Sequence, residues 1–379
     1  ISVISGLTLF YNFLGNDGFA WGVVLGAITQ VAVLLPSVLK NGFRFSLNFG
    51  RSILEKVRRT LLLTVPRTFG LLADKLNLVV MVALASTISE GSVRIFSSAF
   101  DIATVVTGLI GISFATAVFP KLSKSVKENQ ISKENFLKYF SQVFLQILFW
   151  SLAASVVFLM LRIYIVRVIA GYGQCDWDCT QVTAATVGVF SLSLFAQSLI
   201  PLLSRVFFAL KNTIIPVTIG IIGNAINISL ALYFINLAKN NDVFYFSLKT
   251  ILKLTRIQEP EAAIVVVLAL AFSFAALVQF IILWMTLDVK LNGALMSEIS
   301  RSWIKMIVAS AAMLPAIYFS LRIFDLPFKT LFPGKTVIPL FLQGFSAGVI
   351  GILVYILVAK ALKIKPVRDL EAILNKKIF

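Results

Sequence analysis

The sequence predicts an all-α protein that crosses a membrane many times. Hydrophobic residues make up 59% of the 379 residues and charged residues only 13%, which is far from the balance of a water-soluble domain. Apolar stretches of about 20 residues, enough to cross a bilayer core of about 30 Å as a helix, recur along the chain. We expect a polytopic membrane protein with about nine complete transmembrane helices and one partial helix.

The expected spans follow one another with short polar connections. Residues 1–15 form an apolar run that we interpret as part of a helix, and residues 19–39 form the first complete span. Two long helices then occupy the stretch from Arg58 to Lys124. With a boundary error of about two to four residues, the remaining spans are expected at 139–165, 181–208, 213–237, 262–287, 303–323 and 337–359.

The placement of lysine and arginine predicts the orientation of these spans. Cations concentrate in the connections at 40–59, 121–138, 209–212 and 288–305 and in the tail that begins at Lys360. Because short cytoplasmic loops carry an excess of Lys and Arg, we expect these connections and the C-terminus to lie in the cytoplasm. Cys175 and Cys179 then lie on the outer side, and their spacing leaves open whether they form a disulfide or remain thiols.

Two segments have the pattern of a helix that lies in the membrane interface. Lys249, Lys253 and Arg256 alternate with apolar residues at helical spacing, and the tail after Lys360 repeats this pattern. We expect both segments to anchor on lipid headgroups.

Several classes of function have no support in the sequence. The absence of histidine excludes His-based metal sites and catalytic triads. No P-loop or G-x-S-x-G motif occurs, and the cations are not interleaved with aromatic residues as in proteins that bind nucleic acid. We therefore expect no enzymatic activity, no cofactor, no metal and no nucleic-acid partner.

Polar residues inside the spans are the candidates for a functional site. An ionisable group at membrane depth costs roughly 2.5–3.5 kcal/mol even on lenient insertion scales, so such residues should face protein or water. The primary candidates to line a polar cavity are Arg67, Asp74, Lys75, Asn77 and Asp101. The secondary candidates are Arg94, Arg205, Asn224 and Asn227.

Helical spacing relates several of these candidates. Arg67 and Asp74 are seven residues apart and share one helix face. The short turn near Glu90 makes the two central helices antiparallel neighbours, and a rise of about 1.5 Å per residue places Asp101 close to the level of Lys75. We expect these two residues to form an ion pair. The charged residues of the two helices would line a cavity, and a purely structural network is the alternative.

Three segments carry a resemblance to a known family. PRTFGLLADKLNLVVMVALAS, followed by GSVRIFSSAFDI and GLIGISFATAVFPKLSKS, resembles helices seven and eight of the MurJ (MviN) lipid II flippases of the MOP superfamily. SRVFFALKNTIIPVTIGIIGNAINISLALYF resembles the passage from the tenth to the eleventh helix of that family. Aligned in this way, the chain corresponds to helices five to fourteen.

The resemblance implies a fold and a function. It implies a MATE-like fold with two six-helix lobes around a cationic cavity and two additional helices that form a lipid groove. Residues 1–45 would be helices five and six of the first lobe, 46–290 the C-terminal six-helix lobe, and 291–379 the two additional helices with a basic cytoplasmic tail. Such proteins flip the undecaprenyl-pyrophosphate-linked peptidoglycan precursor across the bacterial inner membrane by alternating access, a step of cell-wall synthesis. We expect the chain to be a fragment without the first four helices and to be inactive alone.

Two positions depart from the family pattern. The arginine of the family's eighth helix falls on Asp101, and the aspartate used by members with a sodium site falls on Met81. Arg67 and Lys75 are therefore our candidates to supply the positive charge that a pyrophosphate requires. Coupling to a monovalent cation or to the membrane potential is left open.

Other functions remain alternatives at this point. Asp74 and Asp101 would suit a cation or drug antiporter of the same superfamily, and a flippase for another polyprenyl-linked saccharide is a further alternative. A scaffold that recruits cell-wall synthesis proteins would leave the cavity unused. The expected partners are membrane lipids and the lipid-linked precursor, with cell-wall synthesis proteins as a further class.

Overall fold

The computed structural model describes residues 18–40, 42, 51–127, 130–131, 133–170, 175–252, 260–291, 293–331 and 337–368. The contacts divide the chain into two compact units, residues 1–62 and 63–379, and each is described by itself. The apolar run predicted at 1–15 lies outside the described residues. The lobe boundaries expected after residues 45 and 290 stay predictions.

Unit 1 contains helix α2 (Gly18–Lys40) and the beginning of α3 (Arg51–Ser86). Large apolar side chains of α2, such as Trp21 and Val33, are exposed, as expected for a helix in lipid. Residues 51–59, which the sequence analysis assigned to a connection, belong to α3 instead. No glycine or proline interrupts residues 51–65, so the helix of the span continues backwards into the basic segment.

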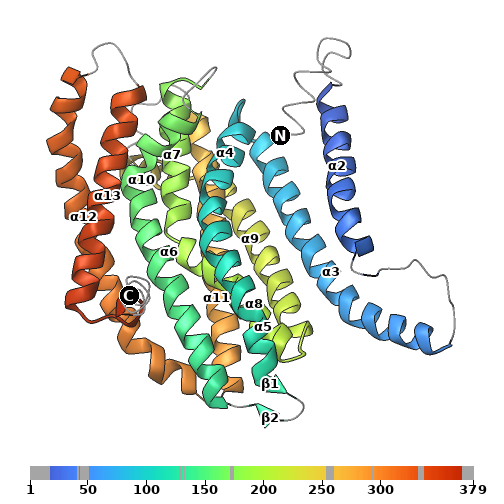
Figure 1. The fold of residues 1–379 in the computed structure, drawn as a ribbon. Helices are drawn as coiled ribbons and strands as arrows, with labels where there is room; N and C mark the ends of the chain where they lie inside the picture. The colour runs from blue at the N-terminus through green and yellow to red at the C-terminus, as the bar shows by residue number, and fades with distance from the viewer. Residues whose placement is uncertain are drawn as a thin grey trace. The chain divides into compact units, whose positions relative to one another are not determined.

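Unit 2 begins with the rest of α3, from residue 63 to Ser86. One long span follows. It consists of α4 (Ser92–Val106), the π-helical turn η2 (Thr107–Ile112) and α5 (Ser113–Ser125). A hairpin of strands β1 (Val126–Lys127) and β2 (Gln130–Ile131) leads to α6 (Lys133–Ala170). The polar loop expected at 121–138 is therefore much shorter than predicted, because both neighbouring helices extend beyond their apolar stretches (Figure 1).

The second half of unit 2 begins with a bent span. Helices α7 (Trp177–Ser191) and α8 (Leu194–Ala209) meet at an angle of 48°. The following elements are α9 (Ile214–Asn240), α10 (Asp242–Ile251), η3 (Pro260–Ile264), α11 (Val265–Lys290), α12 (Ala294–Leu331) and α13 (Val337–Ala361). Among the described residues, eight helices and the one bent pair are long and apolar enough to cross a membrane. The predicted all-α fold with nine complete spans is confirmed.

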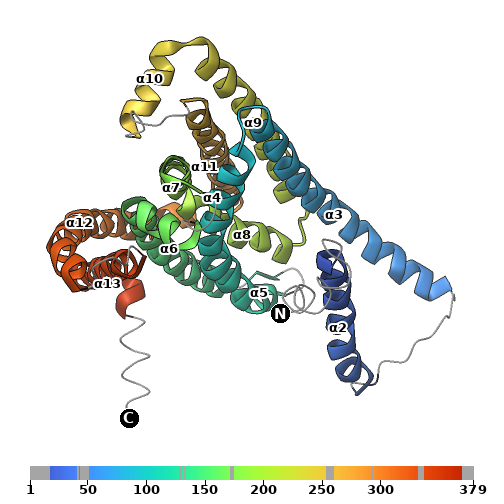
Figure 2. The ribbon, with the colours of Figure 1, turned by 90° about the horizontal axis from the view of Figure 1, so that it is seen from above.

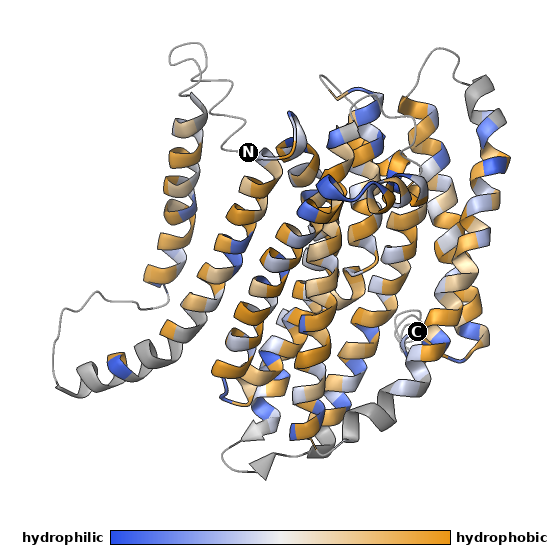
Figure 3. Cartoon of the chain, turned by 180° about the vertical axis from the view of Figure 1, so that it is seen from behind, coloured by the Kyte–Doolittle hydropathy of each residue, from blue (hydrophilic) through white to orange (hydrophobic). Residues whose placement is uncertain are grey.

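Two apolar cores hold unit 2 together. One core joins α5, α6 and α8 to α11, α12 and α13, and its aromatic residues include Phe140, Phe144 and Trp284. The other joins α4, α7 and α11 around Phe96 and Phe190. Helices α12 and α13 pack side by side against α6, as both ribbon views show (Figures 1 and 2). Apolar residues cover most of the span surfaces, and hydrophilic residues gather at the helix ends (Figure 3).

The structure also describes the two outer features noted in the sequence. Helix α10 carries exposed Val243, Phe246 and Ile251, which fits the predicted interfacial helix, whereas Lys253 and Arg256 lie outside the described residues. Cys175 and Cys179 are joined by a disulfide, with their Cα atoms 5.4 Å apart. The structure thus favours the bonded form of the two alternatives.

Candidate functional site

Two amide side chains of α9 hydrogen-bond to side chains of α3. Asn224 Nδ2 donates to Asp74 Oδ1 over 2.9 Å, and Asn227 Nδ2 donates to Asn77 Oδ1 over 3.0 Å. The partner numbers rise together along both helices, so α3 and α9 run parallel here. Because the partners are three residues apart on each helix, each set lies on one helix face. We call these four residues the amide seam.

Glycines occur where α3 and α11 approach α9. A Cβ atom on Gly70, four residues before Asp74, would lie 3.2 Å from Cγ2 of Val217, so α3 and α9 are in tight contact at this position. A Cβ on Gly223 would lie 3.1 Å from Oε1 of Gln279 on α11. Small residues at helix contacts allow such close approach in a membrane, where van der Waals packing and hydrogen bonds drive association.

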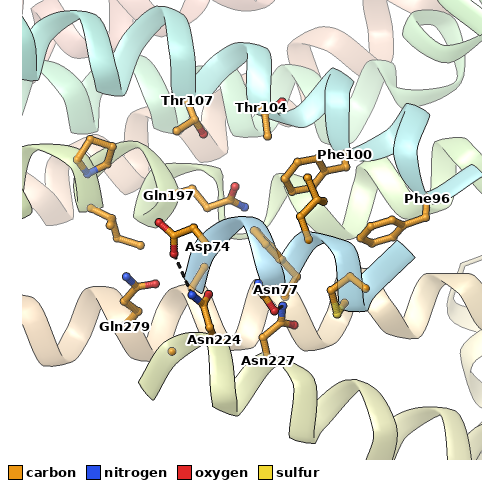
Figure 4. A pocket seen from close by; sticks show the side chains of 18 residues that line it. Asp74, Asn77, Phe96, Phe100, Thr104, Thr107, Gln197, Asn224, Asn227 and Gln279 are labelled. Atoms are coloured by element: carbon orange, nitrogen blue, oxygen red, sulfur yellow. Dashed lines mark hydrogen bonds between the residues drawn. The ribbon is translucent and has the colours of Figure 1, made fainter. Parts of the chain in front are cut away.

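The amide seam forms one wall of a cavity of about 300 Å³ between α3, α4, α8, α9 and α11 (Figure 4). Phe96, Phe100 and Phe272 line its aromatic end, with the rings of Phe100 and Phe272 5.5 Å apart in an edge-on contact. The polar lining residues are Asp74, Asn77, Thr104, Thr107, Gln197, Asn224, Asn227 and Gln279. The cavity therefore has an amide-rich end and an aromatic end.

Two buried oxygen atoms at this cavity have no hydrogen-bond partner among the described residues. They are Oδ1 of Asn227 and Oγ1 of Thr107. The Asn227 side chain is only 2% exposed, so its oxygen is cut off from bulk solvent. A buried polar atom without a partner costs about 1–3 kcal/mol, which favours water or a hydrogen-bonding solute in the cavity.

The lining of this cavity carries little charge. Of the lining residues that the structure describes, only Asp74 is ionisable, and neither Lys nor Arg is among them. Arg67 belongs to α3, but its side chain lies outside the described residues. Lys75 is exposed and points about 100° away from Asp74, and it is not among the residues that line this cavity.

The expected ion pair between Lys75 and Asp101 is wrong. Both side chains are described and exposed, and no ion pair joins them. Helix α4 turns the face of Phe96, Ala99 and Ala103 inward, where α4 contacts α7. Asp101 lies on the opposite, exposed face and does not line the cavity. The rotation of α4 about its axis places Asp101 on this exposed face.

The remaining secondary candidates are also placed. Arg94 is seven residues before Asp101 and shares its exposed face. Arg205 Nη1 donates to the carbonyl oxygen of Ile112, the last residue of η2, over 2.8 Å. In this turn Ser113 Oγ also donates to the carbonyl of Gly108, five residues earlier, over 3.1 Å. Arg205 therefore stabilises a π-helical irregularity in mid-span rather than the cavity.

The structure brings together Asp74, Asn77, Asn224 and Asn227 from the predicted set. The sequence analysis missed Thr104, Thr107, Gln197 and Gln279, which complete the polar lining. It gave most weight to ionisable residues, and uncharged amides and hydroxyls inside apolar helices carry a weaker signal. A systematic search for Asn and Gln within the spans would have found two of the four.

Comparison with known proteins gives the family. The family model described as "Lipid II flippase MurJ" matches residues 1–337. The chain belongs to the lipid II flippase MurJ family. A solved structure of a family member, "Lipid II flippase MurJ, inward closed conformation", matches with a TM-score of 0.66 and 21% identity. That match covers 97% of this chain and 66% of the solved chain and shows the same fold.

Individual members of the MurJ family are distant relatives. The "Probable lipid II flippase MurJ" of Rhizobium meliloti is 29% identical over 219 residues, which are 58% of this chain and 40% of that protein. The protein with the same description in Bdellovibrio bacteriovorus is 28% identical and aligns over 57% of this chain and 41% of its own length. The "Lipid II flippase MurJ" of Burkholderia cenocepacia is 26% identical, with 53% and 39% aligned. The chain thus spans about two fifths of the length of these relatives.

Proposed function

We propose that the chain takes part in moving lipid II, the undecaprenyl-pyrophosphate-linked peptidoglycan precursor, across the bacterial inner membrane. The family match over residues 1–337 carries this proposal, because relatives in that family are described as lipid II flippases. The eight or nine candidate membrane spans among the described residues and a polar cavity between helices of unit 2 are consistent with a transporter. The antiporter alternative gains no support from the family match.

The size of the cavity in unit 2 limits its role. Pockets for drug-sized ligands have volumes of about 300–1,000 Å³, and this cavity of about 300 Å³ is at the lower limit. The headgroup of lipid II, a disaccharide with a peptide on a pyrophosphate, is larger than a drug. We propose that the cavity holds water or a small solute and lets α3 and α9 adjust, while the headgroup binds elsewhere.

The pyrophosphate requires positive charge. Arg67 and Lys75 remain our candidates, since both belong to α3 and Lys75 is exposed. Guanidinium and ammonium groups bind phosphate oxygens through charge-assisted hydrogen bonds. We also propose that transport is coupled to a monovalent cation or to the membrane potential. We further propose that the C-terminus lies in the cytoplasm, and the cations on the connections support this orientation.

A complementation experiment tests the proposed function. This chain would replace the segment of the solved family member that its structure matches, 66% of that chain, and the chimera would be expressed in a strain depleted of its own flippase. We expect growth with normal cell shape, and we expect the Arg67→Ala/Lys75→Ala double variant to lose it. Cell lysis despite a normal amount of the chimera in the membrane would contradict the proposal.

A further inference from the structure

A second, basic cavity lies at the end of unit 2 where α6 begins and α13 ends. Its volume is about 420 Å³. Its lining residues are Lys138, Ser141, Gln142 and Leu145 from α6 and Lys365, Pro366 and Arg368 from the segment after α13. Two segments far apart in the sequence thus bring three cations to one cavity, and none of its described lining residues is acidic.

The turn after α13 directs the chain towards this cavity. Lys363 has a left-handed backbone with φ of 55°, which is uncommon for a residue with a Cβ atom. The amide of Ile364 donates to the carbonyl of Ala359 over 3.1 Å, so the turn closes the end of the helix. Lys305 Nζ donates to the carbonyl of Leu362 over 2.9 Å and ties the same turn to α12.

Buried contacts hold the segment after the turn. Ile364 is 1% exposed and Val367 is 4% exposed, and both belong to the apolar core that contains the start of α6. The exposed cations Lys365 and Arg368 alternate with these buried residues. Burial of the apolar positions therefore fixes the backbone that presents both cations beside Lys138. Three cationic side chains at one cavity favour an anionic ligand there.

The cavity lies at the boundary of the membrane. The apolar span of α6 begins at Phe136, so Lys138 is close to the start of the span and Leu145 lies within it. At about 1.5 Å per residue, the step from Lys138 to Leu145 covers roughly 10 Å, which is enough to pass from the headgroups to the acyl chains. The cavity thus has a cationic mouth and an apolar inner wall.

We propose that this cavity binds the phosphate of an anionic phospholipid headgroup from the adjacent leaflet. Lys138, Lys365 and Arg368 supply charge-assisted hydrogen bonds to the phosphate oxygens, and Leu145 contacts the start of an acyl chain. The apolar wall favours a phospholipid over free phosphate, which would need only the cationic mouth. This site is separate from the amide seam, and the inference does not depend on the proposed flippase activity.

The test measures lipid preference in nanodiscs that contain the full chain. Labelled phosphatidylglycerol is titrated against labelled phosphatidylcholine, and inorganic phosphate is added as a competitor. We expect phosphatidylglycerol to bind about tenfold or more tightly, since each basic residue near the surface favours an anionic lipid. The variant K138Q/K365Q/R368Q should lose this preference. The control K124Q/K211Q/K290Q removes three exposed cations from the same side of unit 2 and should keep it.

Three results would overturn the proposal. One is an unchanged preference in the K138Q/K365Q/R368Q variant, and another is an equal loss in the control. The third is complete displacement of phosphatidylglycerol by millimolar inorganic phosphate, which would assign the cavity to free phosphate. If the triple variant does not fold, as judged by circular dichroism, the single variant Arg368→Gln is used. It should bind phosphatidylglycerol several-fold more weakly than the unmodified chain, and unchanged binding contradicts the site.

Discussion

Asn227 on α9 donates a hydrogen bond to Asn77 on α3 across 3.0 Å, between positions 150 residues apart in the chain. Both side chains are buried, at 2% and 7% exposure. Apolar burial contributes little to the association of helices in lipid, so a bond of this kind helps to hold two parallel helices in register. The neighbouring bond between Asn224 and Asp74 lies on the same faces.

We expect a double-mutant cycle of Asn77→Ala and Asn227→Ala to show coupling. The expected coupling free energy is about 0.6–1.7 kcal/mol, the range of hydrogen bonds between membrane helices. The free energies of unfolding of the two single variants and the double variant would be measured in mixed micelles. Asn77→Ala with Ser310→Ala on α12 is the matched control and should be additive. Additive effects for the Asn77 and Asn227 pair would show that the bond does not stabilise the protein.

Gly111→Ala should destabilise the protein, and Gly108→Ala should not. A Cβ on Gly111 would lie 2.5 Å from the carbonyl oxygen of Ser198 on α8, whereas a Cβ on Gly108 would meet nothing within 4 Å. Forcing an extra methyl group into a packed contact costs about 1–3 kcal/mol. Thermal unfolding of both variants in the same detergent checks this. Equal transition temperatures would mean that α8 and η2 are not in close contact.

Arg205→Leu should also lower stability, because the carbonyl of Ile112 would lose its charged donor. A hydrogen bond to a charged group contributes about 1.5–3 kcal/mol. Arg94→Leu is the control, because that arginine lies on the exposed face of α4. Unfolding free energies measured side by side would separate the two. A loss in the Arg94 variant as large as in the Arg205 variant would point to a general charge effect.

Labelling of single cysteines tests the orientation. Glu90 lies in the turn between α3 and α4, and Lys124 lies at the opposite end of the α4–α5 span. Each would be replaced by cysteine in a variant in which Cys175 and Cys179 are serine. A reagent that cannot cross the membrane should label Glu90→Cys in intact cells but reach Lys124→Cys only after permeabilisation. If intact cells were labelled at Lys124→Cys and not at Glu90→Cys, the protein would have the opposite orientation.

The sequence was sufficient for the fold because hydropathy over about 20 residues is a strong signal. It also named Asp74, Asn77, Asn224 and Asn227 as candidates, because they are polar residues inside apolar helices, but it did not predict that α3 contacts α9. Two features depend on details that hydropathy does not contain. The rotation of α4 moves Asp101 to the exposed face, and the π-helical turn at Thr107–Ile112 lies where Gly111 packs closely against Ser198.

The cavity lining shows a second limit. Gln197 lies on α8 and Gln279 on α11, and their approach to the amide seam depends on how five helices pack. Nothing in the local sequence of either glutamine indicates a common site. Likewise, the basic cavity at Lys138 is completed by Lys365 and Arg368, which follow the left-handed turn at Lys363. Long-range packing of this kind cannot be derived from periodicity.

The most direct test of the account measures lipid II translocation in vesicles. The vesicles would contain the chimera in which this chain replaces the matching segment of the solved family member, and lipid II reaching the outer leaflet would be quantified with an enzyme that cannot enter the vesicles. The account predicts translocation above that of protein-free vesicles, and background translocation for the Arg67→Ala/Lys75→Ala variant. A correctly folded chimera that translocates no more lipid II than protein-free vesicles, while the parent flippase is active, would contradict it.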